Sequence, residues 1–283
     1  MGKNKKNICL LHNTIRGDEK LLIEAAKKFA VNLDVVDVTD LILRTKGQFK
    51  FDVILDRCLS STKGIHAGLF FEGIGIPFVN TVKVAQICED KFATSMKLTE
   101  YKVPTVSFAM VFNVDQAKIA IEEMGGYPIV IKPTVGSWGR LVNKINDLDA
   151  LEAILEHKDT FAGPIHKSFY LQKYIEKPGR DIRVHNINGQ VIAAIYRKSD
   201  HWITNTARGA QPLPCRIDQD LENIAKLTGK AIGAGILGID VFETKDGYLV
   251  NEVNHKLEFK NVQRVTSIDV ASKIIKYCLT CAL

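Results

Sequence analysis

The sequence predicts the α/β fold class, with an open α/β domain first and two α+β subdomains after it. Short apolar runs alternate with helical patterns over about the first ninety residues, which is typical of a doubly wound sheet. Farther on, an apolar strand ends in a lysine just before a glycine loop, and two late strands form an acidic hairpin. We place the domains at residues 1–90, 91–168 and 169–283.

Hydrophobic periodicity predicts the elements of each domain in order. In the first domain, a helix at 18–29 has apolar residues at helical spacing, and strands are expected at 7–12, 34–38, 52–56 and 76–79. The second domain has the lysine strand at 127–133 and helices at 114–124 and 147–157. The third has the hairpin, helices at 218–234 and 269–279, and strands at 170–175, 182–186 and 191–196.

The composition is that of a soluble globular protein, with 46% hydrophobic and 25% charged residues in a chain of 283. No apolar run approaches the ~20 residues of a membrane span, and the run after the basic start is too short for a signal peptide. We therefore expect a cytoplasmic protein with no membrane contact.

The six cysteines are scattered and suggest no disulfide framework. Cys278 and Cys281 form a lone C-x-x-C pair with little support for a metal role.

The net charge of +6 favours anionic partners without naming one. Nucleic acid is disfavoured because the chain has no long basic run, no zinc-finger spacing and no aromatic RNA-binding motif. ATP, an acidic protein or a solvated surface would each explain the charge.

The late hairpin carries a set of hard oxygen ligands. Two apolar strands flank the turn at Asp246 and Gly247, and period-2 alternation places Glu252 and Asn254 on one face of the second strand. Asp240 lies on the partner strand and can reach the same edge. Two carboxylates and an amide suit Mg²⁺ that is shared with substrate phosphates, although an ordinary acidic hairpin has the same pattern.

The glycine loop after the lysine strand is a candidate phosphate site. Its glycines let backbone N–H groups turn toward an anion, and flanking cations add charge. The loop residues concerned are Lys132, Gly136, Ser137, Trp138, Gly139 and Arg140. The loop matches neither G-x-x-x-x-G-K-[ST] nor G-x-G-x-x-G, so an ordinary turn between strands remains the alternative.

Several longer strings make the chain resemble the ATP-grasp superfamily, and within it the RimK-like carboxylate–amine ligases. They are Leu-Gln-Lys-Tyr-Ile-Glu-Lys-Pro-Gly-Arg-Asp-Ile-Arg at 171–183, Ala-Ala-Ile-Tyr-Arg at 193–197, His-Trp-Ile-Thr-Asn-Thr-Ala-Arg-Gly at 201–209 and Asn-Glu-Val-Asn-His-Lys-Leu-Glu-Phe-Lys-Asn at 251–261. With Thr-Ile-Arg at 14–16 and the glycine loop, they look like the ligases that attach α-aminoadipate to the acidic amino-group carrier protein of lysine biosynthesis. The resemblance spans essentially the whole chain and implies two ATP-grasp subdomains behind the N-terminal domain.

The resemblance implies ATP and Mg²⁺, with two ions expected, and assigns site residues. Those expected to bind ATP are Lys91, Lys132, Gly136, Ser137, Trp138, Gly139, Arg140, Gln172, Lys173, Tyr174, Ile175, Asp181, Arg197 and Asn205. Among them Asp181 would lie near the ribose, and Arg183, Arg197 and Lys132 would serve catalysis. Mg²⁺ would be held by Asp240, Glu252 and Asn254. The amino acid would be held by Arg208, His255, Lys260 and Asn261, whose cationic and amide donors suit a dicarboxylate.

The implied reaction activates a carboxylate with ATP. The side-chain carboxylate of the carrier's terminal glutamate would attack the γ-phosphorus to form an acyl phosphate, which the α-amine of α-aminoadipate then attacks to form an amide. Glutamate could replace α-aminoadipate, as in arginine biosynthesis, because one methylene gives only ~1–3 kcal/mol of discrimination. A RimK-type glutamate ligase acting on another protein or cofactor is a further alternative.

Two positions depart from the family pattern. Lys173 stands where an acidic residue is common, and Ala210 follows Gly209 where a second glycine is common. A non-enzymatic nucleotide-binding or nucleic-acid-associated module is the competing class, but it would not need phosphate and metal groups together. We also expect a homo-oligomer.

Overall fold

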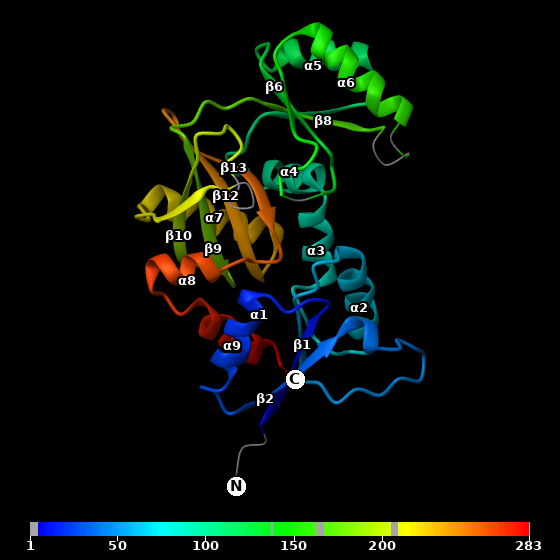
Figure 1. The fold of residues 1–283 in the computed structure, drawn as a ribbon, viewed down its shortest axis with the longest axis vertical. Coiled ribbons are helices and arrows are strands. Elements are labelled where there is room, and N and C mark those ends of the chain that lie inside the picture. Colours follow the sequence, from blue (N-terminus) through cyan, green and yellow to red (C-terminus); the bar gives the residue numbers. More distant parts are fainter. Residues whose placement is uncertain (1–4, 137, 162, 164–166, 205–208, 283) are drawn as a thin grey trace.

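The computed structural model describes residues 5–136, 138–161, 163, 167–204 and 209–282, which form three sheets. The first sheet lies at one end of the elongated molecule and the second at the other end, with the third between them (Figure 1). The predicted order of one α/β domain and two α+β subdomains is therefore confirmed.

The first sheet is parallel, in the order β2-β1-β3-β4. Alternate residues of β1 face opposite sides, so that Ile8 and Leu10 join one core cluster while Cys9 and Leu11 join another. The strands are β1 (Lys6–His12), β2 (Val31–Asp37), β3 (Val53–Asp56) and β4 (Phe78–Val79), and the helices are α1 (Gly17–Ala26), η1 (Val38–Asp40) and α2 (Ser61–Gly73). Burial of β1 and β3 on both faces explains the apolar runs of these two strands.

Two consecutive helices, α3 (Val82–Glu89) and α4 (Lys91–Glu100), lead from the first sheet to the rest of the chain. Asp90 separates them and caps α4, because its side chain accepts hydrogen bonds from the backbone N–H groups of Phe92 and Ala93. The Lys91 N–H donates to the carbonyl of Thr134 at 2.9 Å, which holds the start of α4 against the glycine loop.

The second sheet is antiparallel, in the order β5-β8-β6-β7. Its elements are β5 (Phe108–Val111), α5 (Val114–Glu123), β6 (Ile129–Lys132), β7 (Asn143–Ile145), α6 (Leu148–Phe161) and β8 (Phe169–Lys173). The boundary that we expected between residues 168 and 169 needs a correction, because β8 pairs with both β5 and β6 and so belongs to this sheet. β5 and β7 were not predicted, since each is shorter than five residues and carries little periodicity.

The third sheet is also antiparallel, in the order β11-β10-β9-β12-β13, and α3, α4 and α7 cover one of its faces. Its elements are β9 (Arg180–Ile187), β10 (Gln190–Lys198), β11 (Gln211–Pro214), α7 (Gln219–Ile232), β12 (Ile236–Thr244) and β13 (Gly247–Asn254). The predicted hairpin is β12–β13. The chain then forms α8 (Lys260–Thr266) and α9 (Val270–Cys281).

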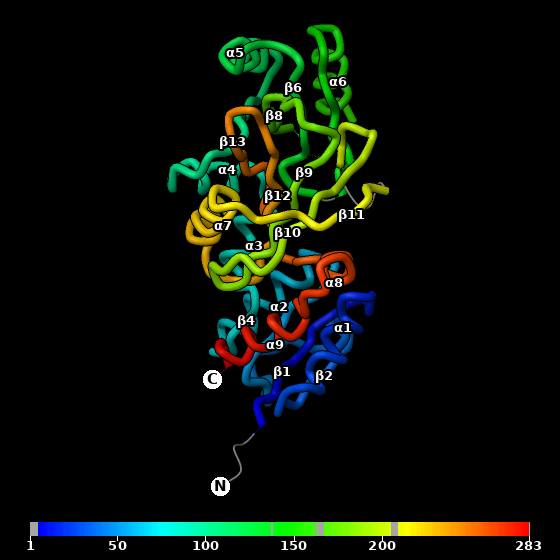
Figure 2. The backbone as a smooth tube through the Cα atoms, turned by 90° about the vertical axis from the view of Figure 1, so that its left-hand side faces the viewer, coloured from blue at the N-terminus to red at the C-terminus, as the bar shows by residue number. Residues whose placement is uncertain are grey.

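The last part of the chain returns to the first sheet, as Figure 2 shows for α8 and α9 beside α1. Buried polar bonds fix this contact. Arg57 donates through Nε to Glu19 at 2.9 Å and through Nη1 to the carbonyl of Leu257 at 2.8 Å. Asp18 accepts from the N–H groups of Phe259 and Lys260. The loop that follows β13 is thus held firmly against the N-terminal domain.

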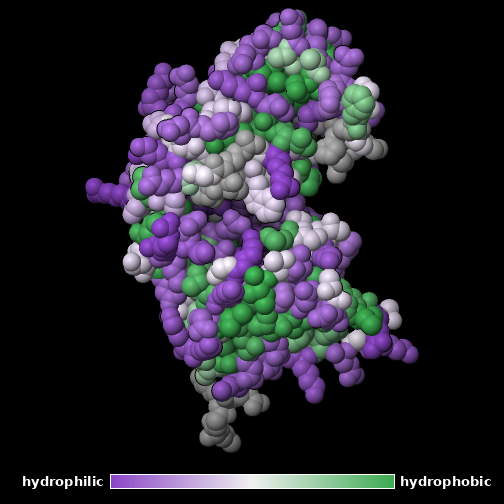
Figure 3. Space-filling view, viewed as in Figure 1, coloured by the Kyte–Doolittle hydropathy of each residue, from purple (hydrophilic) through white to green (hydrophobic). Residues whose placement is uncertain are grey.

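Hydrophilic side chains dominate the upper part of the face in Figure 3, whereas hydrophobic ones gather lower down, on the N-terminal domain. Within the described part of the chain, no helix has both the length and the apolar character needed to span a bilayer.

Candidate active site

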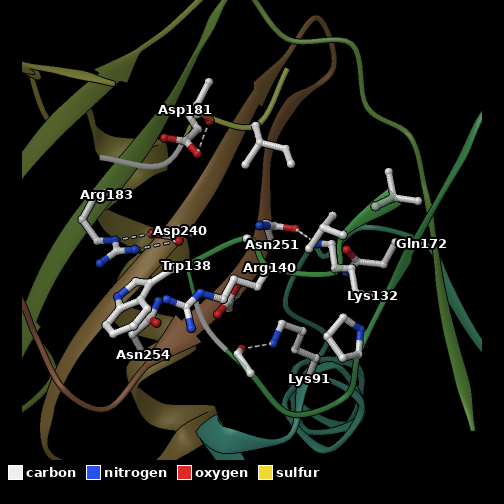
Figure 4. Close-up of a pocket in the computed structure, with 18 of the residues that line it drawn as sticks. Lys91, Lys132, Trp138, Arg140, Gln172, Asp181, Arg183, Asp240, Asn251 and Asn254 are labelled. Carbon is white, nitrogen blue, oxygen red and sulfur yellow. Dashed lines mark hydrogen bonds and ion pairs between the residues drawn. The ribbon is translucent and has the colours of Figure 1, made fainter. Parts of the chain in front are cut away.

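A cavity of about 380 Å³ opens between the second and third sheets and extends to the N-terminal domain. Lys132 and Gln172 line it from the second sheet, Arg183, Asp240 and Glu252 from the third. Lys132 and Gln172 lie across the cavity from Arg183 and Asp240 in Figure 4. The predicted site residues thus come from distant parts of the sequence and meet in one place.

Two lysines define the part of the cavity beside the glycine loop. Lys132 ends β6, is 9% exposed, and donates from Nζ to Oδ1 of Asn251 at 2.9 Å. Burial lowers the pKa of Lys132 to about 8, although the charge of Glu252 opposes this. Lys91 donates from Nζ to the carbonyl of Gly136 at 2.6 Å (Figure 4). An anion in the cavity would find both ammonium groups close by.

The glycine loop turns through left-handed backbone at several positions. Gly136 has φ of 132° and Gly139 has φ of 65°, values that glycine adopts without strain. Trp138 also has positive φ, at 62°, and the Arg140 guanidinium lies 5.0 Å from its ring centroid. Both side chains line the cavity, so this loop is a wall of it; Ser137 lies outside the described residues.

The end of β8 and the segment after it form another wall, contributed by Gln172, Lys173, Tyr174 and Ile175. Gln172 is buried and donates to the Tyr170 hydroxyl at 2.8 Å. The end of β8 thus presents both polar and apolar groups to the cavity, and adenine contacts there stay a prediction.

The third sheet carries a row of ion pairs on its cavity face. Ile182 and Val184 of β9 point into the core beside α7, which leaves Asp181 and Arg183 on the opposite face. Register places Asp181 opposite Arg197 and Arg183 opposite Asp240. Because of this alternation, these four predicted residues form one charged surface on the cavity face of the sheet.

The Arg197 guanidinium connects two carboxylates. It donates to both oxygens of Asp181, at 2.6 and 2.7 Å, and lies 3.0 Å from Oδ2 of Asp240. Arg183 also forms a bidentate pair with Asp240. Burial alone would raise the pKa of Asp240, but the two arginines hold it below its ordinary value. Arg183 and Arg197 are therefore fixed in the cavity wall and are not loose surface residues.

Asp181 has partners that the sequence did not foretell. Besides Arg197, it accepts a hydrogen bond from the Thr204 hydroxyl at 2.5 Å, and Lys177 donates to the same hydroxyl at 2.8 Å. Its carboxylate is thus engaged by protein groups, and the expected ribose contact stays a prediction.

The predicted metal ligands lie together on the hairpin. Asp240 is directly opposite Glu252 across β12 and β13, and Asn254 follows two residues later on β13. For Glu252 the structure gives no hydrogen bond or ion pair among the described residues, and the buried Nδ2 of Asn254 has no partner. A carboxylate without a hydrogen bond or ion pair from the described residues, such as that of Glu252 beside the buried Asp240, fits a cation shared with phosphates, and Asn254 would add its amide oxygen. In the described part of the chain, no three His, Cys, Asp or Glu residues could hold a metal by themselves.

The remaining predicted residues divide into three groups. His255 lines the cavity and its Nε2 lies 2.7 Å from Oε1 of Glu89. Lys260 and Asn261 do not line the cavity, because they begin α8 with exposed side chains while Asp18 holds the backbone of Lys260. Asn205 and Arg208 lie outside the described residues.

Sequence reasoning missed five charged residues that line the cavity: Arg16, Glu89, Lys177, Lys256 and Glu258. Arg16 and Lys256 belong to strings that carried the family resemblance, so a role for them could have been suspected. Glu89 ends α3 without any pattern around it, and only the fold brings it to the cavity.

A nucleotide-sized cavity between two α+β sheets, with lysines and a glycine loop on one side and paired carboxylates on the other, defines an ATP-grasp ligase. Solved structures share this fold. The RimK domain protein ATP-grasp from Sphaerobacter thermophilus has a TM-score of 0.78 at 24% identity, over 96% of this chain and 99% of that one. D-alanine–D-alanine ligase from Bacillus anthracis, complexed with ATP, has a TM-score of 0.70 at 17% identity, over 99% and 97%.

Sequence comparisons identify the family. A RimK-like ATP-grasp domain model matches residues 88–278, and a LysX preATP-grasp domain model matches residues 8–87. The α-aminoadipate–LysW ligase LysX of Saccharolobus solfataricus is 35% identical, over 92% of this chain and 96% of its own length. The glutamate–LysW ligase ArgX of Sulfolobus acidocaldarius is 31% identical, over 95% and 97%. The chain belongs to the RimK-like ATP-grasp family and is an ATP-dependent carboxylate–amine ligase.

Proposed function

We propose that this protein joins the α-amino group of α-aminoadipate to the side-chain carboxylate of the C-terminal glutamate of a LysW-type carrier protein, within lysine biosynthesis. This proposal is supported mainly by the similarity to LysX along nearly the whole chain. The cavity also has the groups that the reaction needs, namely cations, carboxylates and a glycine loop. We place the reaction in the cytoplasm, where ATP and amino-acid intermediates occur together.

The cavity supplies what carboxylate activation requires. A carboxylate and the γ-phosphate of ATP repel each other, so cations must lie between or beside them. In this proposal Lys132 and Lys91 contact the phosphates of ATP, while Arg183 and Arg197 of the third sheet lie beside the carrier's carboxylate. The carboxylate oxygen bonds to the γ-phosphorus and ADP departs, which leaves an acyl phosphate on the carrier. The uncharged amine then bonds to the acyl carbon, and phosphate departs with the C–O electron pair and takes up the proton that the amine loses.

Mg²⁺ would be held by Asp240, Glu252 and Asn254, and when bound it neutralises phosphate charge. The chain's own contribution is to keep this set in place, since Arg183 and Arg197 orient the carboxylate of Asp240. The glycine loop would cover the phosphates and exclude the water that hydrolyses an acyl phosphate.

Glutamate as the acceptor is the second candidate, because two glutamate–LysW ligases are 30–31% identical to this chain over 95% of its length. Either acceptor would react in the same cavity, and some members of the family could accept both. A net charge of +6 would favour an acidic carrier in either case.

The deciding experiment mixes the purified protein, a LysW-type carrier, ATP and Mg²⁺ with either α-aminoadipate or glutamate. We expect ADP release and a mass increase of the carrier by one α-aminoadipate residue, with a smaller response to glutamate. A carrier that lacks its terminal glutamate is the matched control. Modification of that truncated carrier, or release of ADP without any mass change, would contradict the proposal.

A further inference from the structure

One end of the cavity, toward the N-terminal domain, has charged side chains that carboxylate activation does not use. They are Arg16 from the start of α1, Glu89 from the end of α3 and Lys256 from the loop after β13. Glu258 also lines the cavity there, but it is paired with Arg16 at 2.9 Å. Apart from Glu258, this group, here called the acceptor end, combines two cations with one carboxylate. A dicarboxylic amino acid carries the opposite set: two carboxylates and one ammonium.

Lys256 has unused hydrogen-bonding capacity. Its Nζ is buried and makes no hydrogen bond, and its ion pair with Oδ2 of Asp56 is long, at 3.4 Å. Gly64 of α2 leaves room for this pair, because a Cβ there would lie 2.5 Å from Asp56 Oδ2 and 3.1 Å from Lys256 Nζ. An ammonium with three N–H donors is costly to bury without acceptors, so this one is suited to a ligand carboxylate.

Glu89 has unused acceptor capacity in the same region. Its Oε1 accepts from the Ser61 hydroxyl at 2.5 Å and pairs with Nε2 of His255 at 2.7 Å, while Oε2 has no partner among the described residues. Burial would raise the pKa of Glu89, but the His255 and Ser61 hydrogen bonds and the nearby charge of Lys256 hold it below its ordinary value. A carboxylate kept ionised with one open oxygen is a receptor for an ammonium group.

We propose that Lys256 and Glu89 select the amino acid by binding its carboxylate and its ammonium respectively, with Arg16 receiving the second carboxylate. This rests on the proposed function, since it names the contacts of the acceptor in that reaction. Arg16 donates to Glu19 and Glu258 but keeps further N–H groups for a ligand, because a guanidinium has five. The acceptor end adjoins Asn254 and His255, so an amino acid held there has its amine near the predicted metal and phosphate groups.

The main test is Lys256→Met, which keeps the length of the stem and removes the charge. Losing a charge-assisted hydrogen bond corresponds to a rise of about 10- to 100-fold in KM for α-aminoadipate. KM for ATP should change less than two- or three-fold. Lys63→Met, an exposed lysine on α2 that does not line the cavity, is the matched control and should leave both constants unchanged.

Asp56→Asn distinguishes a substrate-binding role of Lys256 from a purely structural role as the ion-pair partner of Asp56. It breaks the Lys256–Asp56 ion pair as completely as Lys256→Met does, but it leaves the ammonium in the cavity. If Lys256 binds substrate, Asp56→Asn keeps KM for α-aminoadipate near the wild-type value. If both variants raise KM equally, Lys256 is only a structural partner of Asp56 and the inference is overturned.

Glu89→Gln tests the ammonium contact with norleucine and adipate as competing ligands. Norleucine keeps the ammonium and one carboxylate of α-aminoadipate, and adipate keeps both carboxylates, so both should inhibit the wild type. In Glu89→Gln, inhibition by norleucine should weaken at least several-fold, while adipate, which has no ammonium, should inhibit as before. Equal loss for both, or loss for neither, would refute the assignment of Glu89.

Trapping with hydroxylamine tests formation of the acyl phosphate separately from binding of the amino acid. Hydroxylamine is unprotonated at neutral pH and small enough to trap an acyl phosphate without the acceptor end. Wild type and Lys256→Met should both convert the carrier to a hydroxamate in the presence of ATP. Failure of the wild type would refute the proposed function, whereas normal hydroxamate formation with unchanged KM for α-aminoadipate in Lys256→Met would refute only the assignment of Lys256.

Discussion

The lowered pKa of Lys132 predicts how the affinity for ATP depends on pH. Burial lowers this pKa from 10.5 to about 8 in the free protein, which corresponds to a cost of about 3 kcal/mol for holding the charge there. A bound triphosphate offers that charge a partner and raises the pKa again. The free protein therefore holds Lys132 mostly protonated below about pH 8 and mostly neutral above it, so ATP binding at higher pH should take up a proton.

The size of the effect follows from the fraction of protonated Lys132. This fraction falls from about nine-tenths at pH 7 to about one-tenth at pH 9, so ATP affinity should fall about ten-fold between these values. Titration calorimetry with a non-hydrolysable ATP analogue measures this directly. Buffers of different ionisation enthalpy should reveal about one proton taken up near pH 9 and little at pH 7.

Lys132→Met should bind the analogue weakly at both pH values and show no proton uptake. Lys97→Met is the control, because Lys97 lies on α4, pairs with Glu100 at 2.6 Å and does not line the cavity. An affinity that stays flat from pH 7 to pH 9 in the wild type, or that falls equally in Lys132→Met, would refute the reasoning.

Four further predictions can be checked with standard assays. Glu252→Gln should suppress ADP formation at saturating ATP and Mg²⁺ without lowering Tm, and near-normal turnover would remove Glu252 from the metal site. Gly139→Val places a β-branched side chain at φ of 65° and should raise KM for ATP strongly; unchanged ATP kinetics would make the loop an ordinary turn. Arg57→Met leaves the buried Glu19 without one of its partners and should lower the free energy of unfolding by about 3–5 kcal/mol in a denaturant titration, which an unchanged midpoint would contradict. Raising salt to about physiological strength should increase KM for the carrier several-fold while KM for ATP changes less, and a flat response would argue against a basic docking surface.

The fold was predictable where periodicity is strong. The β12–β13 hairpin and the long helix α7 combine apolar spacing with clear ends, namely a turn at Gly247 and an aspartate cap at Asp218. The short strands β5 and β7 lack both signals, and β11 contains two prolines, which is unusual for a strand and suits its place at the edge of the sheet. The placement of β8 depends on pairing partners far away in the sequence, so no local pattern could reveal it.

Only the site residues that stand in recognisable sequence motifs could be predicted. Lys132, Asp240 and Glu252 stand in strings with a recognisable chemical logic, and the structure brings them to one cavity. The partner of Asp181 could not be foreseen, because its pairing with Arg197 depends on the register between β9 and β10. Glu89 reaches the cavity through tertiary packing alone, and an isolated acidic residue at a helix end looks like any other.

The packing of α9 against the first domain has a consequence for how the protein is made. Ile274, Ile275 and Cys278 of α9 complete the same apolar cluster as Ile8 and Leu10 of β1. The part of this face that α1 does not cover therefore stays exposed until the ribosome has synthesised α9, long after the strands of that sheet have emerged. Contacts between residues so far apart in the chain slow folding and leave apolar surface exposed meanwhile. We expect the nascent chain to depend on a chaperone during synthesis, and ribosome-bound chains that end before α9 to be far more sensitive to protease in the first domain than chains that include it.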